Sequence, residues 1–379
     1  MRGIRKIVLA PTAFKGSLDP VQAAEAMEHG VRRVLPEAHT LFMPLADGGD
    51  GMLKCLARAG VCQMSTHVVH DALGRLHEAP FGLTPDGTTG FVEIAQVCGL
   101  VQLRPEERDP RRTTTFGVGE MIAHLLQRGV QRLVIGLGGS ATNDGGSGAL
   151  AALGWRLLER DGAPISAGNS GLLGLHRVVP SPCCLEGVEV LIAADVRNPL
   201  LGKRGATRVF APQKGATVEM LPEMDRALWR WAISVHRATG RKLSRVPGAG
   251  AAGGLAFGLL AHFRHARLVS GAEYVMQAVG FEQALRTADL VITGEGRVDE
   301  TTLHGKLLLR VLRVCRRHRV PVLVICGEFV GDPTLLNRWE VLGCEALVSA
   351  TVARDDAMRF AEELVAQKTA KLLAPLSGL

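Results

Sequence analysis

Five polar turns carry the side chains of this chain that could bind an anion, hold a metal ion or move a proton. The richest in glycine is GLGGSATNDGGSG (136–148), which has six glycines in thirteen residues and directly follows a short apolar run. Glycine loses more conformational freedom on folding than any other residue, so this composition indicates that something approaches the backbone closely. Consecutive N–H groups before a helix form a cradle for phosphate, and the alternative is a glycine-lined contact between two tightly packed helices.

Carboxylates dominate two further turns. In ADGGDGM (46–52), Asp47 and Asp50 flank two glycines, a spacing that could hold Mg²⁺ through one carboxylate and water or could simply complement a helix dipole. In AADVRNPLLG (193–202), Asp195 ends an expected strand. A carboxylate there could act as a general base or hold a metal ion, and the alternative is that it caps the next turn.

The turn APTAFKGSL (10–18) carries a cation in place of an acid. Lys15, Gly16 and Ser17 could contact an anion near the N-terminus of the following helix. The alternative is an ordinary strand–helix connection in which Ser17 is a minor cap, and the sequence favours neither interpretation.

The fifth turn, TGEGRVDETTLHGK (293–306), combines acids, hydroxyls and a lysine. Glu295 and Asp299 are four residues apart around a Gly–Arg turn, and Thr302 and Lys306 follow on one expected helix face. Such a set exceeds what a connecting loop needs, so we predict that this turn is functional.

Short apolar and β-branched runs must position these turns. Their continuous apolar character is typical of parallel strands covered on both faces, and they span 4–10, 40–45, 132–137, 188–194, 289–294, 320–326 and 345–350. Helices are expected between many of them, at 20–35, where Asp19 is the expected N-cap and Pro20 the first helical residue, and at 112–129. This alternation predicts βαβ units, in which ligands bind beyond the carboxyl ends of the strands.

Residues 64–95 differ, because strand-like pieces separated by turn residues predict antiparallel hairpins there. We therefore predict an α/β protein of two domains. Residues 1–62 and 283–379 form a discontinuous Rossmann-like domain with a parallel sheet, and residues 63–282 form an inserted second α/β domain. The cleft between the domains is the expected active site.

The composition limits the classes of protein. The 379 residues are 47% hydrophobic and 4% aromatic, which suits helices packed closely on sheets, and no apolar run is long enough to span a membrane. The net charge of +7 comes from scattered residues, and the densest basic run, 310–319, has the spacing of a solvated helix face. Nucleic acid is not an expected partner, because aromatic residues do not interleave with the basic ones, whereas a mildly positive field favours small anionic substrates.

The eight cysteines include no CxxC pair, so we expect no zinc site. They lie at positions 55, 62, 98, 183, 184, 315, 326 and 344. Their spacing suits reduced, mostly buried thiols in a cytoplasmic protein. The N-terminal stretch MRGIRKIVLAPTAF is consistent with that compartment, since it resembles a first strand more than a signal peptide.

Two common nucleotide-binding signatures are missing from the sequence. Gly248, Gly250 and Gly253 match the dinucleotide spacing, but no strand is expected before them and Pro247 would interrupt one. Neither Gly–Lys dipeptide is followed by the Ser or Thr of a P-loop. A nucleotide would therefore need a different cradle.

Seven motifs, taken in order, resemble the bacterial glycerate kinases of the two-domain type with an inserted domain, which are not P-loop enzymes. They are PTAFKGSL, PLADGGDG, IGLGGSATNDGG, ADVRNPLLG, APQKGAT, GAGAAGGL and VITGEGRVDETTLHGK. The resemblance spans nearly the whole chain and implies ATP-dependent phosphorylation of D-glycerate, at the 2-hydroxyl, with Mg²⁺. The first motif departs from the family's usual PDSFKGS, because Thr12 and Ala13 replace the acid and the serine.

Phosphoryl transfer needs positioning and charge neutralisation more than covalent chemistry, and this guides the roles that we expect. The expected residues for ATP are Gly138, Gly139, Ser140, Thr142, Asn143, Gly294, Glu295 and Lys306. The expected ligands of Mg²⁺ are Asp47, Glu295 and Asp299. The expected base is Asp195, with Asp299 or Asp47 as rivals, and the cations that could pair with the glycerate carboxylate are Lys15, Arg297 and Lys214. Asp144 has no assigned role.

Alternatives to this function stay open. The product could carry its phosphate on the 3-hydroxyl, or the acceptor could be a related small hydroxy acid. An NAD(P)-dependent oxidoreductase that uses the GAGAAGG turn and a metabolite-binding protein without catalysis are two other classes. The expected partners are D-glycerate and ATP, with no membrane and no nucleic acid, and a homodimer is left open as the assembly.

Overall fold

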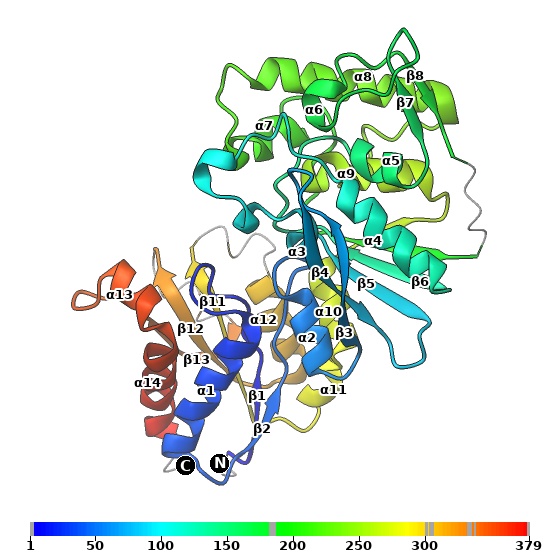
Figure 1. The fold of residues 1–379 in the computed structure, drawn as a ribbon. Helices are drawn as coiled ribbons and strands as arrows, with labels where there is room; N and C mark the ends of the chain where they lie inside the picture. Colours follow the sequence, from blue (N-terminus) through cyan, green and yellow to red (C-terminus); the bar gives the residue numbers. More distant parts are fainter. Residues whose placement is uncertain are drawn as a thin grey trace. The chain divides into compact units, whose positions relative to one another are not determined.

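The computed structural model describes residues 4–181, 187–299, 302, 307–331, 336 and 339–376. The chain is a mixed α/β protein that packs into two compact units (Figure 1). Unit 1 consists of Met1–Asp47, Lys54–Val61 and Ala272–Leu379, and unit 2 consists of Gly48–Leu53 and Cys62–Gly271. The predicted fold class is confirmed, whereas the predicted domain limits and the predicted cleft stay predictions.

Unit 1 is built on a sheet of five parallel strands in the order β13-β12-β11-β1-β2. The strands are β1 (Lys6–Leu9), β2 (His39–Phe42), β11 (Leu290–Val298), β12 (Val322–Phe329) and β13 (Val341–Ala346). The sheet joins the first two and the last three of the predicted strands. Because β1 and β11 are parallel neighbours, the turns that follow them lie at the same edge of the sheet.

Unit 1 contains the following helices, the first of which begins at Pro20, as the sequence predicts. They are α1 (Pro20–Val34), α2 (Met52–Arg58), α10 (Gly271–Ala278), α11 (Phe281–Leu285), α12 (Leu307–His318), α13 (Arg354–Arg359), α14 (Ala361–Leu373) and the 3₁₀ turn η6 (Ala374–Leu376). Asp19 caps α1 as predicted, since it accepts hydrogen bonds of 2.9 Å from Val21 N and Gln22 N. Ser17 Oγ donates to Phe14 O instead, so its alternative role as a cap is wrong. Helices α1 and α14 pack side by side (Figure 1).

Unit 2 holds a mixed sheet of six strands in the order β10-β9-β6-β5-β4-β3. Its strands are β3 (Gln63–His70), β4 (Leu76–Leu83), β5 (Thr89–Glu93), β6 (Arg132–Gly136), β9 (Glu189–Ala193) and β10 (Arg267–Val269), and a separate pair is formed by β7 (Arg156–Leu158) and β8 (Arg177–Val179). Strands β3, β4 and β5 run antiparallel, which confirms the predicted hairpins, while β5, β6, β9 and β10 are parallel.

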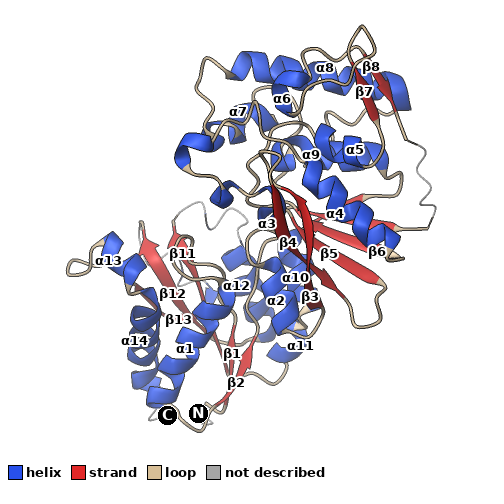
Figure 2. Ribbon diagram, in the orientation of Figure 1, coloured by secondary structure: helices blue, strands red, loops and turns tan. Residues whose placement is uncertain are grey.

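Unit 2 also contains helices and short 3₁₀ turns. They are α3 (Ala95–Cys98), η1 (Leu100–Gln102), η2 (Pro105–Glu107), α4 (Phe116–Gln127), α5 (Ser147–Ala152), α6 (Gly168–Gly171), α7 (Ala206–Phe210), η3 (Pro212–Lys214), α8 (Leu221–Thr239) and α9 (Ala251–His262). Helices α5 to α9 gather above the sheet of unit 2 in the view of Figure 2. A large cluster of buried apolar side chains forms the main core, and Trp231 of α8 and Phe257 of α9 are among its largest members.

The structure corrects three predicted element limits. Strand β11 continues to Val298, because it pairs with β12 as far as Phe329, so the predicted Gly–Arg turn is extended strand. Strand β13 begins at Val341 and not at 345, because it is a partly exposed edge strand without the continuous apolar run of a central one. Helix α4 begins at Phe116, since the threonines before it (113–115) bond to the glycine-rich turn.

Among the described residues there is no helix with the length and apolar character that a membrane span needs. The described cysteines are free thiols, and all of them except Cys344 are buried. Cys183 and Cys184 lie outside the described residues.

Candidate active site

In unit 2 the first half of the glycine-rich turn packs directly on the acidic turn. Gly138 N donates to Gly48 O at 3.2 Å, and a Cβ on Gly138 would lie 2.2 Å from Gly49 Cα, so no side chain fits there. A Cβ on Gly139 would lie 2.5 Å from Asp50 Oδ1, which places that carboxylate beside the turn. These two glycines are therefore required for the close approach of two loops.

The end of β9 lies against the same acidic turn. Gly48 has a φ of +83°, and a Cβ there would lie 2.9 Å from Ala193 O, the last residue of β9. Two residues later, Asp195 Oδ1 accepts a hydrogen bond of 2.6 Å from Ser270 Oγ, which follows β10. The carboxyl ends of β6 and β9 thus bring the predicted base and the glycine-rich turn to one edge of the sheet.

Glu93, the last residue of β5, anchors the acidic turn. It is 1% exposed, and its carboxylate accepts hydrogen bonds from Gly51 N and Leu53 N, each at 2.9 Å, and from Gln96 Nε2 at 3.1 Å. Burial raises the pKa of Glu93, and the hydrogen bonds oppose this shift. The sequence analysis missed this residue, although an acid inside the apolar run FVEIAQV is an unusual feature that could have drawn attention to it.

Asp144 is the structural centre of the glycine-rich turn. It is fully buried, and its Oδ2 accepts hydrogen bonds from Thr115 N at 2.8 Å, from Thr115 Oγ1 at 2.9 Å and from Gly148 N at 3.2 Å. Its Oδ1 accepts from Gly146 N at 3.0 Å. Burial raises the pKa of Asp144, and these hydrogen bonds oppose the shift. Because Asp144 occupies the N–H groups at the start of α5, those groups stabilise the fold.

We expect the Asp144→Ala variant to be strongly destabilised. Removal of the carboxylate leaves buried donors on Thr115, Gly146 and Gly148 without an acceptor, and each such donor costs about 1–3 kcal/mol. Even the smallest summed loss, about 3 kcal/mol, should lower the midpoint of thermal unfolding by about 6–12 °C, given about 2–4 °C per kcal/mol for a domain of this size. The matched control is Asp161→Ala, which removes an exposed acid of the same unit. Scanning calorimetry should show a change in its free energy of unfolding within about 0.5 kcal/mol. An unchanged midpoint for Asp144→Ala would contradict this structural role.

The second half of the glycine-rich turn is a packing contact. Thr142 and Asn143 are fully buried, and Asn143 Nδ2 donates to Thr207 Oγ1 at 3.0 Å. A Cβ on Gly253 would lie 1.9 Å from Thr142 O, and a Cβ on Gly254 would lie 2.8 Å from Gly145 Cα. The segment with the dinucleotide spacing therefore packs on this turn, and no strand precedes it.

Lys214, at the end of η3, reaches the same turn from within unit 2. Its Nζ donates to Ser140 Oγ at 2.8 Å and to Thr142 O at 2.7 Å. The residue is 2% exposed, and burial lowers the pKa of Lys214 to about 8. Of the cations predicted to pair with the glycerate carboxylate, Lys214 is thus the one whose charge lies beneath the protein surface.

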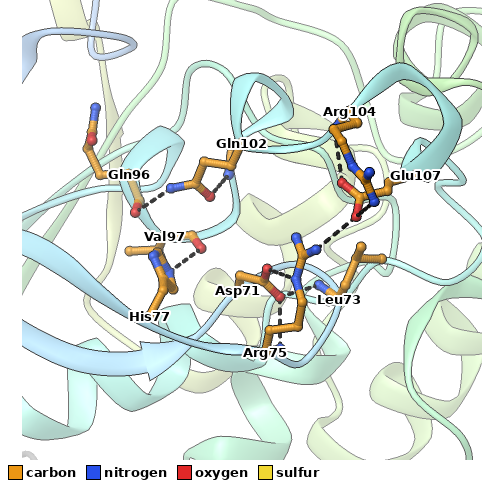
Figure 3. Close-up of polar contacts among 10 residues, drawn as sticks. Asp71, Leu73, Arg75, His77, Gln96, Val97, Gln102, Arg104 and Glu107 are labelled. Atoms are coloured by element: carbon orange, nitrogen blue, oxygen red, sulfur yellow. Dashed lines mark hydrogen bonds and ion pairs between the residues drawn. The ribbon is translucent and has the colours of Figure 1, made fainter.

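A polar network fixes the chain between β3 and α4, which carries the threonines that contact the glycine-rich turn. Figure 3 shows Asp71 accepting hydrogen bonds from Leu73 N, Arg75 N and Arg75 Nε. Arg75 also donates to Glu107 at 2.8 Å, and Glu107 accepts from Arg104. The hydrogen bonds from Arg104 and Arg75 lower the pKa of Glu107 to about 2.

In unit 1 the turn after β1 lies beside the end of β11. Thr12 N donates to Gly294 O at 2.8 Å, and a Cβ on Gly296 would lie 3.1 Å from Lys15 N. Lys15 is exposed and lies at a cavity of about 60 Å³. The polar residues that share the lining of this cavity with Lys15 are Ser17, Glu328 and Arg354.

The charged residues of the predicted fifth turn gather at the same edge of unit 1. Glu295 and Arg297 lie on β11 two residues apart, so their side chains share one face of the strand. Arg297 Nε lies 3.4 Å from Asp299 Oδ2, and Thr302 N donates to Asp299 Oδ1 at 3.2 Å. Lys306 lies outside the described residues.

No group of three or more His, Cys, Asp and Glu side chains in the described part of the chain could hold a metal ion by itself. The predicted carboxylates are exposed Asp47 and partly buried Glu295 and Asp299. The structure therefore presents the predicted site residues in two groups, one around Ser140 and Asp195 in unit 2 and one around Lys15 and Glu295 in unit 1.

Comparison with known proteins gives a consistent result over the whole chain. Residues 7–377 match the profile of the Glycerate kinase family. Two relatives named glycerate kinase are 41% identical over 371 residues (Bacillus subtilis, 97% of each chain) and 39% identical over 363 residues (Halalkalibacterium halodurans, 95% of each chain). The glycerate 2-kinase of Escherichia coli is 37% identical over 374 residues, 98% of each chain. A crystal structure assigned as glycerate kinase 2 of Salmonella typhimurium LT2 has a TM-score of 0.83 and 38% identity, and covers 99% of each chain.

Proposed function

Because the chain belongs to the glycerate kinase family, we propose that it transfers the terminal phosphoryl group of ATP to D-glycerate. The observation that carries this proposal is the match of residues 7–377 to the family, together with the coverage of 97% of both chains in the match to the Bacillus subtilis relative. We place the new phosphate on the 2-hydroxyl, since one relative is named glycerate 2-kinase. We place the protein in the cytoplasm, because its described cysteines are free thiols and the cytoplasm is a reducing compartment.

To residues of unit 2 we assign the binding of the ATP phosphates and the removal of the proton from the glycerate hydroxyl. The backbone around Gly138, Gly139 and Ser140 would hold phosphate oxygens, while buried Thr142 and Asn143 would support that backbone from within. Asp195 would accept the proton of the glycerate hydroxyl. The hydrogen bond from Ser270 holds the carboxylate of Asp195 in a fixed orientation, which favours a role as general base.

To residues of unit 1 we assign the binding of the glycerate carboxylate and of the metal ion. Exposed Lys15 and Arg297 would pair with the carboxylate of glycerate, and Arg297 can do so through two hydrogen bonds. Mg²⁺ prefers oxygen ligands and is commonly held by one or two carboxylates together with substrate phosphates, so Glu295 and Asp299 fit it. Bound Mg²⁺ would neutralise charge on the transferred phosphoryl group.

A coupled assay of ADP release tests the proposed reaction. The purified chain is incubated with MgATP and D-glycerate, L-glycerate, D-lactate or no acceptor. We expect ADP release that depends on D-glycerate and is lost when Mg²⁺ is removed with EDTA. ADP release with another hydroxy acid but not with D-glycerate would overturn the substrate, and oxidation of NAD(P)H with no ADP release would overturn the kinase reaction.

A further inference from the structure

The ammonium of Lys214 is buried without a bound carboxylate. Its two hydrogen-bond acceptors, Ser140 Oγ and Thr142 O, are both neutral. Among the described residues none forms an ion pair with Lys214, and Asp144 and the Cys98 thiol are the titratable groups whose charges act on it. A buried charge of this kind is costly to a fold, which suggests that it serves another purpose.

The position of Lys214 determines what the Ser140 hydroxyl can do. An ammonium group has donors and no acceptor, so Ser140 Oγ must accept the hydrogen bond from Lys214. The hydrogen of the same hydroxyl must then donate elsewhere, and no other described residue bonds to it. The backbone N–H groups of Gly139 and Ser140 likewise donate to no described residue. Two adjacent residues thus offer three donors next to a buried positive charge.

We propose that Lys214 is a positioning residue, which fixes the Ser140 hydroxyl as a donor to the phosphate chain of the nucleotide. This inference rests on the proposed function, in which the nucleotide donates the phosphoryl group. Phosphate is favoured over the glycerate carboxylate as the occupant, because the attraction of a buried cation grows with the charge of its ligand. Asp50, beside Gly139, would repel a bare phosphate, which is consistent with a nucleotide that binds as its Mg²⁺ complex.

This arrangement predicts a dependence of nucleotide affinity on pH. The unliganded pKa of Lys214 is about 8, lowered by burial and partly restored by Cys98 and Asp144. A phosphate bound nearby favours the charged ammonium and so raises this pKa. Affinity is therefore highest while Lys214 is protonated and falls as the pH rises above about 8. The terminal phosphate of the nucleotide has a pKa of about 6, so it is already fully ionised at these pH values.

The test measures nucleotide binding apart from turnover. Calorimetry gives the dissociation constant of MgATP at pH 7.0 to 9.5 for the wild type, Lys214→Met, Ser140→Ala and Lys242→Met, the last being an exposed lysine of the same unit. KM for ATP and for D-glycerate is measured in parallel. We expect Lys214→Met to weaken MgATP binding about 10- to 100-fold at pH 7 and to abolish the pH dependence of binding. Ser140→Ala should weaken MgATP binding about 3- to 10-fold and retain the pH dependence. Lys242→Met should match the wild type in both.

The outcomes separate this inference from the proposed function. If Lys214→Met turns over D-glycerate and binds MgATP as tightly as the wild type, the inference is wrong and the function stands. If the variant raises KM for D-glycerate and not for ATP, the turn binds the acceptor and the inference is also overturned. If the wild type binds MgATP with the expected pH dependence but releases no ADP with D-glycerate, the inference stands and the function fails. Should Lys214→Met not fold, unchanged MgATP binding by Ser140→Ala is enough to reject it.

Discussion

The Asp195→Asn variant is expected to lose about 10²- to 10⁴-fold in kcat, the range typical of a removed general base. Asparagine keeps the size of the side chain and can still accept the hydrogen bond from Ser270, but it cannot take a proton from the glycerate hydroxyl. Because the change removes proton transfer and not a binding contact, KM for ATP should stay close to its wild-type value. Steady-state kinetics with ATP as the varied substrate, at saturating D-glycerate, measure both quantities.

Ser270→Ala is the matched control for this prediction. It keeps the carboxylate of Asp195 and removes the hydrogen bond of 2.6 Å that orients it. A hydrogen bond to a charged group is worth about 1.5–3 kcal/mol, so its loss should lower kcat by at most about 10- to 150-fold. Near wild-type turnover by Asp195→Asn with intact substrate binding would assign the base elsewhere, and Asp299 and Asp47 would be the next residues to test.

The Gly138→Ala variant is expected to lose about 10²-fold or more in kcat/KM. The added methyl group would lie 2.2 Å from Gly49 Cα, a backbone atom that cannot move aside without shifting the whole acidic turn. A displacement of about 1 Å at a catalytic site costs roughly 10²-fold in rate. The strain should also lower stability by about 1–3 kcal/mol, which leaves a folded protein to assay.

Gly174→Ala provides the comparison for Gly138→Ala. Gly174 lies in unit 2 with no positive φ. The nearest neighbour of an added Cβ would be the flexible end of Glu159, at 3.2 Å from Oε1, and Gly171 O would be in ordinary contact at 3.5 Å. Its kcat/KM should equal that of the wild type. Full activity of Gly138→Ala would mean that the contact between the two turns is not needed for catalysis.

The sheets of this protein could be predicted from the sequence because their central strands are continuous apolar runs. Strands β1, β6 and β9 lie within the predicted runs, and the hairpins of β3 to β5 follow their turn residues. Edge strand β13 was displaced in the prediction, because its partly exposed residues do not form an apolar run. The length of β11 was also missed, since pairing with β12 and not local composition extends it through Arg297.

The glycine-rich turn shows why the candidate site was only partly predictable. The sequence offered two interpretations. Residues 142–148 are a packing contact, whereas the approach of a ligand to residues 138–140 stays a prediction. Asp144, Glu93 and Lys214 have roles that depend on partners far away in the sequence, Thr115, Gly51 and Ser140 respectively. No local pattern encodes such pairings, because burial and hydrogen bonding arise only when the strands are brought together.

The central claim, phosphorylation of the 2-hydroxyl of D-glycerate by ATP, is tested most directly by ³¹P NMR of the product. The purified chain is incubated with MgATP and D-glycerate, and the spectrum is recorded with proton coupling. The account predicts a new monoester signal split into a doublet by the single proton on C2, as in 2-phosphoglycerate. A triplet from the two protons on C3 would contradict the 2-hydroxyl, and the absence of any new monoester would contradict the kinase reaction itself.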